Sequence, residues 1–153
     1  MSAAAPITTA TWVAVFDGGR AATFENEGFD DAPNLRYVFG ARTDNPPPRE
    51  HYADRQGRRP TPAGGRAAIE RTDAHEAAET AFIEDYAHEI DAAASAGRFD
   101  RLVVIAPGGL MPVFLGAAPH ASKLLAATRA GDFAHAPVEE IERAFREALA
   151  DPR

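Results

Sequence analysis

A run of five apolar residues, Leu102–Ala106 (LVVIA), constrains the fold more than any other feature of the sequence. It lacks polar alternation, which is typical of a strand buried on both faces of a sheet. Pro107-Gly108-Gly109 ends the run, and a short segment with a helical pattern follows over Leu110–Ala118. A central strand covered on both sides needs helices on both faces, so the sequence predicts an α/β domain.

Four further strands and two longer helices complete the predicted order, βββ–loop–α–β–α–β–α, which indicates one domain with a mixed sheet. The first two strands flank a Gly-Gly turn and predict a hairpin. Asp73 and Glu76 have capping-box spacing and predict a helix that ends near Gly97. The sheet centre is expected at Val13, Val15, Val103 and Ile105. The strands are predicted over Thr11–Asp17, Arg20–Glu25, Leu35–Ala41 and Leu124–Phe133, and the last helix over Val138–Leu149.

The length of 153 residues fits one domain over residues 11–149, with a flexible N-terminus (1–10) and a short tail (150–153). The absence of cysteine excludes disulfides, thiolate metal sites and cysteine nucleophiles. The net charge of −7 disfavours a polyanion-binding surface over the whole protein. There is no run of 18 apolar residues and no secretory signal pattern, so we expect a cytoplasmic protein without a membrane span.

Residues 42–72 carry a charge opposite to that of the rest of the chain. They contain seven arginines and four acidic residues, net +3, whereas the remainder has nine basic and nineteen acidic residues, net −10. The segment is rich in proline and glycine, which predicts a long mobile loop. Such a loop could contact RNA phosphates without sequence specificity, or it could be a solvated loop without a ligand. The candidate RNA- or anion-binding residues are Arg55, Arg58, Arg59, Arg66 and Arg71.

Three segments resemble a known bacterial family: WVAVFDGGRAATFE at 12–25, GRFDRLVVIAPGGLMPVFLGAA at 97–118 and DFAHAPVEEIERAF at 132–145. They resemble the host attachment family, the "protein required for attachment to host cells". That family is similar to the central domain of archaeo-eukaryotic release factors and of Pelota. The resemblance covers about residues 11–149 and implies an RNase H-like three-layer α/β fold, with a five-stranded mixed sheet in the order 3-2-1-4-5.

In the release factors, the long loop before the main helix carries Gly-Gly-Gln, and this chain has Gly64-Gly65-Arg66 in the same interval. The resemblance therefore makes Gly64, Gly65 and Arg66 the candidate residues of a peptidyl-tRNA esterase. Arginine in place of glutamine disfavours that activity, so we favour a non-catalytic domain that binds the ribosome, tRNA or a protein partner. A protein-interaction module in surface attachment is a third alternative. No DNA partner, metal or cofactor is expected.

Asp17 ends the first strand, where nucleases of the RNase H type keep a metal-binding aspartate. The expected partner position after Leu102–Ala106 is occupied by Pro107 and Gly108, so Asp17 is interpreted as a turn residue that binds backbone N–H groups. Ligands favour the carboxyl ends of strands, which makes Asp17, Gly108 and Gly109 a possible ligand-binding turn.

Two helical pairs with i, i+4 spacing, His75 with Glu79 and Glu84 with His88, are interpreted as surface pairs. Neither pair offers enough ligands for a closed zinc site. The sequence identifies no partner for the other histidines, which are His51, His120 and His135.

Overall fold

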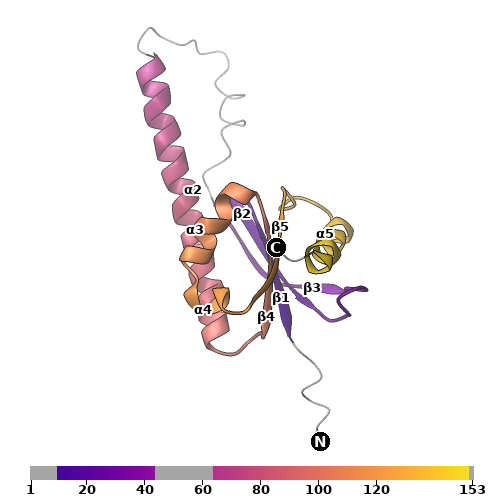
Figure 1. The fold of residues 1–153 in the computed structure, drawn as a ribbon. Helices are drawn as coiled ribbons and strands as arrows, with labels where there is room; N and C mark the ends of the chain where they lie inside the picture. The colour runs from indigo at the N-terminus through magenta and orange to yellow at the C-terminus, as the bar shows by residue number, and fades with distance from the viewer. Residues whose placement is uncertain (1–9, 44–63, 152–153) are drawn as a thin grey trace, which may run out of the picture.

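The computed structural model describes residues 10–43 and 64–151, with side chains in the second range from residue 73 on (Figure 1). The strands are β1 (Thr11–Phe16), β2 (Arg20–Asn26), β3 (Leu35–Arg42), β4 (Arg101–Ala106) and β5 (Leu125–Ala130). The helices are α2 (Gly64–Ser95), the 3₁₀ helix η2 (Gly108–Leu110), α3 (Met111–Gly116), α4 (Pro119–Ser122) and α5 (Val138–Ala150).

The five strands form one mixed sheet in the order β3-β2-β1-β4-β5. β2 is antiparallel to both β1 and β3, whereas β4 is parallel to both β1 and β5. A hairpin connects β1 to β2, and helical crossovers connect the parallel strands. The predicted sheet order 3-2-1-4-5 and the single α/β domain are confirmed.

Helices cover both faces of the sheet: α2, α3 and α4 pack on one face and α5 on the other (Figure 1). Stacked aromatic rings fill the layer between the sheet and the helices α2, α3 and α4. The ring centroids of Trp12 and Phe99 lie 4.8 Å apart, and those of Phe16 and Phe114 lie 4.9 Å apart. Strand alternation explains the two layers, because successive side chains of β1 point to opposite faces.

The layer under α5 contains all four residues predicted at the sheet centre. Val13, Val15, Val103 and Ile105 are fully buried, and they pack in one cluster with Phe145 of α5. The interpretation of β4 as a strand buried on both faces is confirmed.

The main helix α2 begins at Gly64, nine residues before the expected start at Asp73. The prediction that the loop extends to residue 72 is therefore wrong, and the Asp73–Glu76 pair lies inside the helix. Residues 64–72 lack an apolar stripe, but helix propensity does not depend on one. The segment includes the good helix formers Arg66, Ala67, Ala68, Glu70 and Arg71.

Smaller differences occur near the C-terminal end of the sheet. β5 ends at Ala130, before the predicted Phe133, because the chain turns at Gly131 and the Phe133 ring packs over that glycine. An ideal Cβ on Gly131 would lie 2.6 Å from a Phe133 ring carbon. The short helix α4 was not predicted, since its four residues have no periodicity to read.

Two polar contacts hold α2 in place. The buried Tyr86 hydroxyl lies 2.6 Å from Thr23 Oγ1 on β2, and burial raises the pKa of Tyr86, so the phenol stays neutral. Asp91 Oδ1 accepts a hydrogen bond from the Ala121 backbone N–H at 2.8 Å, and Asp91 Oδ2 lies 2.8 Å from His120 Nδ1. Burial opposes ionisation of Asp91, but these hydrogen bonds outweigh it and hold its pKa below the ordinary value.

Within the described residues, none of the helices combines the length and the apolar character that crossing a bilayer requires.

We expect Ile105→Ala to lower the free energy of unfolding by about 2–5 kcal/mol, because it leaves a cavity between two covered layers. Urea denaturation followed by circular dichroism measures the loss. Val138→Ala is the matched control: Val138 is 37% exposed, and its truncation is expected to change stability by less than about 0.5 kcal/mol. A loss below about 0.5 kcal/mol for Ile105→Ala would show that β4 is not the central buried strand.

The lowered pKa of Asp91 predicts a specific loss of stability in acid. The carboxylate stabilises the folded state above about pH 4, the ordinary pKa of an aspartate, and this contribution disappears as the pH falls through the lower folded-state value. Asp91→Asn is therefore expected to lower Tm at neutral pH and to flatten the Tm decrease between about pH 5 and pH 3. Asp132→Asn, at an exposed position, is the control. An unchanged acid profile in the Asp91 variant would contradict the prediction.

Candidate functional site

The turns that follow β1, β4 and β5 meet along one edge of the sheet. β1 and β4 run parallel with Val15 opposite Ile105, so Asp17 and Pro107 follow neighbouring strand ends. The Gly131 N–H donates to the Ala106 carbonyl at 3.0 Å, which brings the end of β5 to the same edge. The predicted turn residues Asp17, Gly108 and Gly109 therefore share the edge at which α/β sheets bind ligands.

Asp17 organises the β1–β2 turn. Its Oδ1 accepts hydrogen bonds from the backbone N–H groups of Gly19 and Arg20, both at 2.9 Å, and its own N–H donates to the Arg20 carbonyl at 2.9 Å. The interpretation of Asp17 as a turn residue is confirmed.

His135, in the segment between β5 and α5, lies between two charged side chains of this turn. Its Nε2 is 3.4 Å from Asp17 Oδ2, and its Nδ1 accepts a hydrogen bond from Arg20 Nη1 at 2.7 Å. His135 therefore contacts Arg20 and lies beside Asp17 at this turn. No sequence pattern indicates this contact, since Asp17 and His135 are far apart in the chain.

Glu79 of α2 lies against the same turn. An ideal Cβ on Gly18 would lie 2.5 Å from the Glu79 carboxyl carbon, so the glycine makes room for this side chain. His75 Nε2 is 3.1 Å from Glu79 Oε2, which confirms the predicted i, i+4 pair. Within the described part of the chain, no three acidic or histidine side chains are grouped so that they could hold a metal ion.

Gly108 and Gly109 form the start of η2, and close packing does not explain either glycine. A Cβ on Gly108 would lie 3.9 Å from Ala130 Cβ, and one on Gly109 would meet nothing within 4 Å. Their role in binding a ligand stays a prediction.

The arginine-rich segment is only partly described. Arg66 and Arg71 belong to α2, as do Gly64 and Gly65. Arg55, Arg58 and Arg59 lie outside the described residues, as does His51. The binding roles predicted for these arginines therefore stay predictions.

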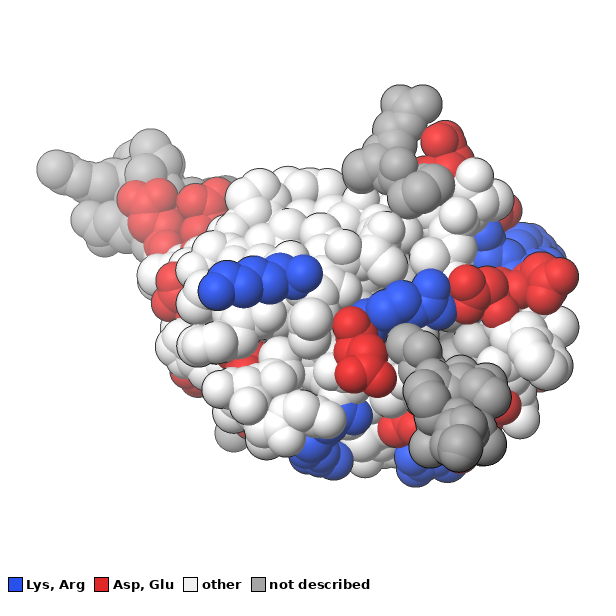
Figure 2. Space-filling model, turned by 60° about the horizontal axis from the view of Figure 1, so that its bottom comes forward, with Lys and Arg blue, Asp and Glu red and all other residues white. Residues whose placement is uncertain are grey.

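Two arginines of the sheet, Arg36 on β3 and Arg101 on β4, are engaged by acidic neighbours. Arg36 pairs with Glu25 and Glu27, and Arg101 Nη2 lies 2.6 Å from Asp30 Oδ1. Figure 2 shows the molecule from its other end, where basic side chains are separated by uncharged or acidic surface. The described body offers no continuous basic patch on this face.

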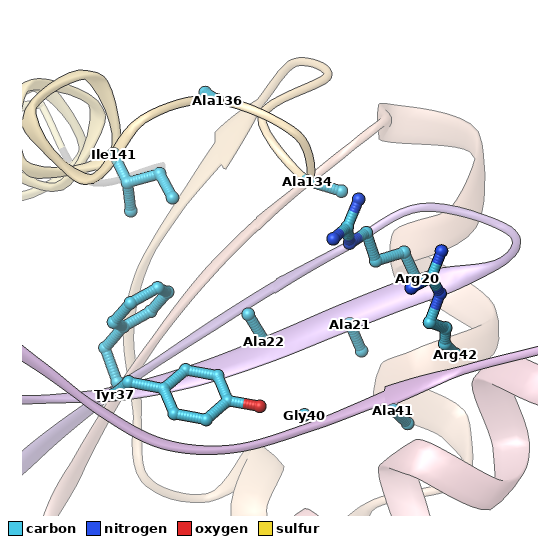
Figure 3. Close-up of a pocket in the computed structure, with 11 residues that line it drawn as sticks. Arg20, Ala21, Ala22, Tyr37, Gly40, Ala41, Arg42, Ala134, Ala136 and Ile141 are labelled. Carbon is cyan, nitrogen blue, oxygen red and sulfur yellow. The ribbon is translucent and has the colours of Figure 1, made fainter.

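A groove of about 450 Å³ lies over β2 and β3, on the side of the sheet that carries α5 (Figure 3). Arg20 and Arg42 stand at one end of it, and Tyr37 lies along its β3 wall. The sequence pattern did not indicate Arg20 or Tyr37 as site residues, because both occupy ordinary positions in strands. It assigned Arg42 to the loop 42–72, whereas Arg42 is the last residue of β3.

A family model described as bacterial archaeo-eukaryotic release factor family 12 matches residues 10–145, from the start of β1 into α5. The chain belongs to this family. No curated protein matches the chain. The release-factor part of the predicted resemblance is confirmed, whereas the host-attachment name stays a prediction. The matched range of release factor family 12 includes Gly64, Gly65 and Arg66 as well as the turn residues Asp17, Gly108 and Gly109.

We expect no magnesium- or manganese-dependent nuclease activity, because such chemistry needs several carboxylates that converge on two cations. Asp17→Ala is instead expected to lower the free energy of unfolding by about 1–3 kcal/mol, since two backbone N–H groups lose a charged acceptor. Cleavage of RNA and of RNA–DNA hybrids is assayed alongside thermal unfolding. Metal-dependent cleavage by the wild type that Asp17→Ala abolishes would contradict this view of the turn.

Proposed function

We propose that this release factor family 12 protein is a non-catalytic domain that binds RNA of the translation machinery, on the ribosome or as tRNA, through the arginine-rich segment 42–72. The observation that carries the proposal is the reversal of charge within a release-factor-like chain, +3 in this segment against −10 elsewhere. A ribosomal partner would place the protein in the cytoplasm.

The separation of a basic segment from an acidic body supports contact with RNA through that segment alone. An acidic body is repelled by phosphates, so a basic segment orients the approach of the protein to RNA. Arg36, Arg101 and Arg129 of the described body form ion pairs with acidic side chains, which reduces what they can offer to a polyanion. The arginine excess of residues 42–72 is therefore the main attractive feature for phosphates.

The arrangement of α2 supports presentation of this segment away from the acidic body. α2 has 32 residues, which corresponds to a length of about 48 Å. Among its described side chains, the buried ones begin at Ile83. Figure 1 shows the N-terminal part of α2 extending well beyond the sheet. Arg66 and Arg71 belong to this extended part, and the segment that contains Arg55, Arg58 and Arg59 leads into it.

Peptidyl-tRNA hydrolysis has less support. Gly64, Gly65 and Arg66 are the first residues of α2, so their backbone is helical and not that of an extended loop. A guanidinium has no acceptor atom, whereas a glutamine amide can both accept from and donate to a water. Arg66 could therefore hold a phosphate or a carbonyl, but it could not orient a hydrolytic water as glutamine does.

The proposal predicts salt-dependent association with ribosomes. Replacement of Arg55, Arg58 and Arg59 by alanine is expected to lower the ribosome-bound fraction about tenfold at low salt and to reduce the log–log salt slope by about 2, the value for three phosphate contacts. Sedimentation through sucrose gradients at several salt concentrations measures both quantities.

The matched control removes three exposed charges from the body, Lys123, Arg143 and Arg146, and is expected to sediment like the wild type. Equal effects of the two triple variants, or no co-sedimentation at all, would refute binding through the segment and would favour a protein-interaction module. A peptide-release assay on the same ribosomes separates binding from hydrolysis: we expect no release, and release by the wild type would establish the esterase.

A further inference from the structure

The open groove of about 450 Å³ lies where α5 leaves the sheet uncovered. α5 packs in one cluster with residues of all five strands, including Phe24 of β2 and Leu35 of β3. Its Ile141 lines one wall of the groove beside that cluster, and Ala134 and Ala136 come from the segment that precedes the helix. The floor belongs to β2 and β3. The volume falls within the range of small-molecule sites, about 300–1,000 Å³.

Two arginines face this groove from neighbouring strands. Arg20 on β2 and Arg42 on β3 are direct cross-strand partners, and both line the groove. Like charges directly opposite each other destabilise a strand pair. Among the described residues, neither guanidinium forms an ion pair with a carboxylate; Arg20 donates to His135 instead. Figure 3 shows the two side chains rising on the same side of the sheet. This end of the groove favours an anion that can accept from two guanidinium groups.

An exposed aromatic ring lies along the wall of the groove. Tyr37 is 58% exposed and meets Phe24 edge-on, with ring centroids 5.9 Å apart. Its hydroxyl reaches over Gly40, where an ideal Cβ would lie 2.5 Å from that oxygen (Figure 3). Ala22 adds a second small side chain to the lining. Small residues beside an exposed ring leave room for a flat ligand that stacks on the ring.

The aromatic and cationic parts are close enough for one small ligand. Gly40, under the tip of Tyr37, is two residues from Arg42 along β3, or roughly 7 Å. A ligand with a planar ring and a phosphate separated by a sugar can therefore meet both parts. We propose that the groove binds a free nucleoside monophosphate, with the base against Tyr37 and the phosphate between Arg20 and Arg42.

This binding site does not depend on contact between the arginine-rich segment and the ribosome. It uses Tyr37 and Arg20, which lie outside that segment, and the ribosome test changes Arg55, Arg58 and Arg59 but not Arg42. The two proposals can therefore fail separately.

Isothermal titration of the full chain with AMP tests the site. We expect AMP to bind at least tenfold more tightly than either adenosine or inorganic phosphate. Tyr37→Ala and Arg42→Gln are each expected to weaken AMP binding about tenfold or more, in line with the loss of one stacking platform or one charged donor. Both positions are exposed, so the variants are expected to keep the wild-type Tm.

Two matched controls separate the groove from general surface effects. Phe29→Ala removes another exposed aromatic ring, 74% exposed in the β2–β3 connection, and Arg143→Gln removes an exposed arginine on α5. Both are expected to bind AMP like the wild type. No binding of AMP at millimolar concentration, equal affinity for AMP and inorganic phosphate, or wild-type affinity in the Tyr37 variant would each overturn the proposal.

Discussion

The burial of β4 between β1 and β5 is the constraint on which the rest of the structure depends. Every residue from Leu102 to Ala106 is fully buried, so both faces of this strand must be covered. Apolar side chains on two faces can leave water only if helices pack on each side. The three-layer arrangement follows from this burial. The parallel pairing of β4 with β1 and β5 places the ends of these three strands at one edge.

The covered and uncovered parts of the sheet differ in what they can do. At the strand-end edge, the Asp17 carboxylate accepts a backbone hydrogen bond within its own β1–β2 turn. His135 contacts both Asp17 and Arg20. Polar groups that satisfy one another in this way are suited to holding a turn, and they offer little to a substrate. Over β2 and β3, by contrast, an exposed ring and two arginines face an open groove. The capacity to bind a small ligand is therefore greatest where the helical cover ends.

Family membership and charge together support a role at RNA. The match to release factor family 12 spans the whole sheet, and the net charge of +3 is carried by residues 42–72, from the last residue of β3 into the first residues of α2. The length of α2 separates the start of that helix from the acidic body, which lowers the repulsion that the body exerts on phosphates. Fold and charge distribution thus favour the same functional hypothesis from independent observations.

The sequence by itself determined the elements with strong local patterns. The unbroken apolar run of β4 predicted the α/β class. The Gly-Gly turn predicted the hairpin of β1 and β2, and the apolar face of α5 predicted the last helix. The sheet order came from the resemblance to the release-factor central domain. The start of α2 could not be found in this way, because residues 64–72 form a helix without an apolar stripe.

Only the tertiary structure decided the contacts between distant segments. His135 meets Asp17 and Arg20, Asp91 meets α4, and Arg20 faces Arg42 across two strands, yet no pattern in the chain relates these residues. The physical reason is that hydrophobic periodicity reports which face of an element is buried, whereas polar contacts depend on register and on where connections cross the sheet.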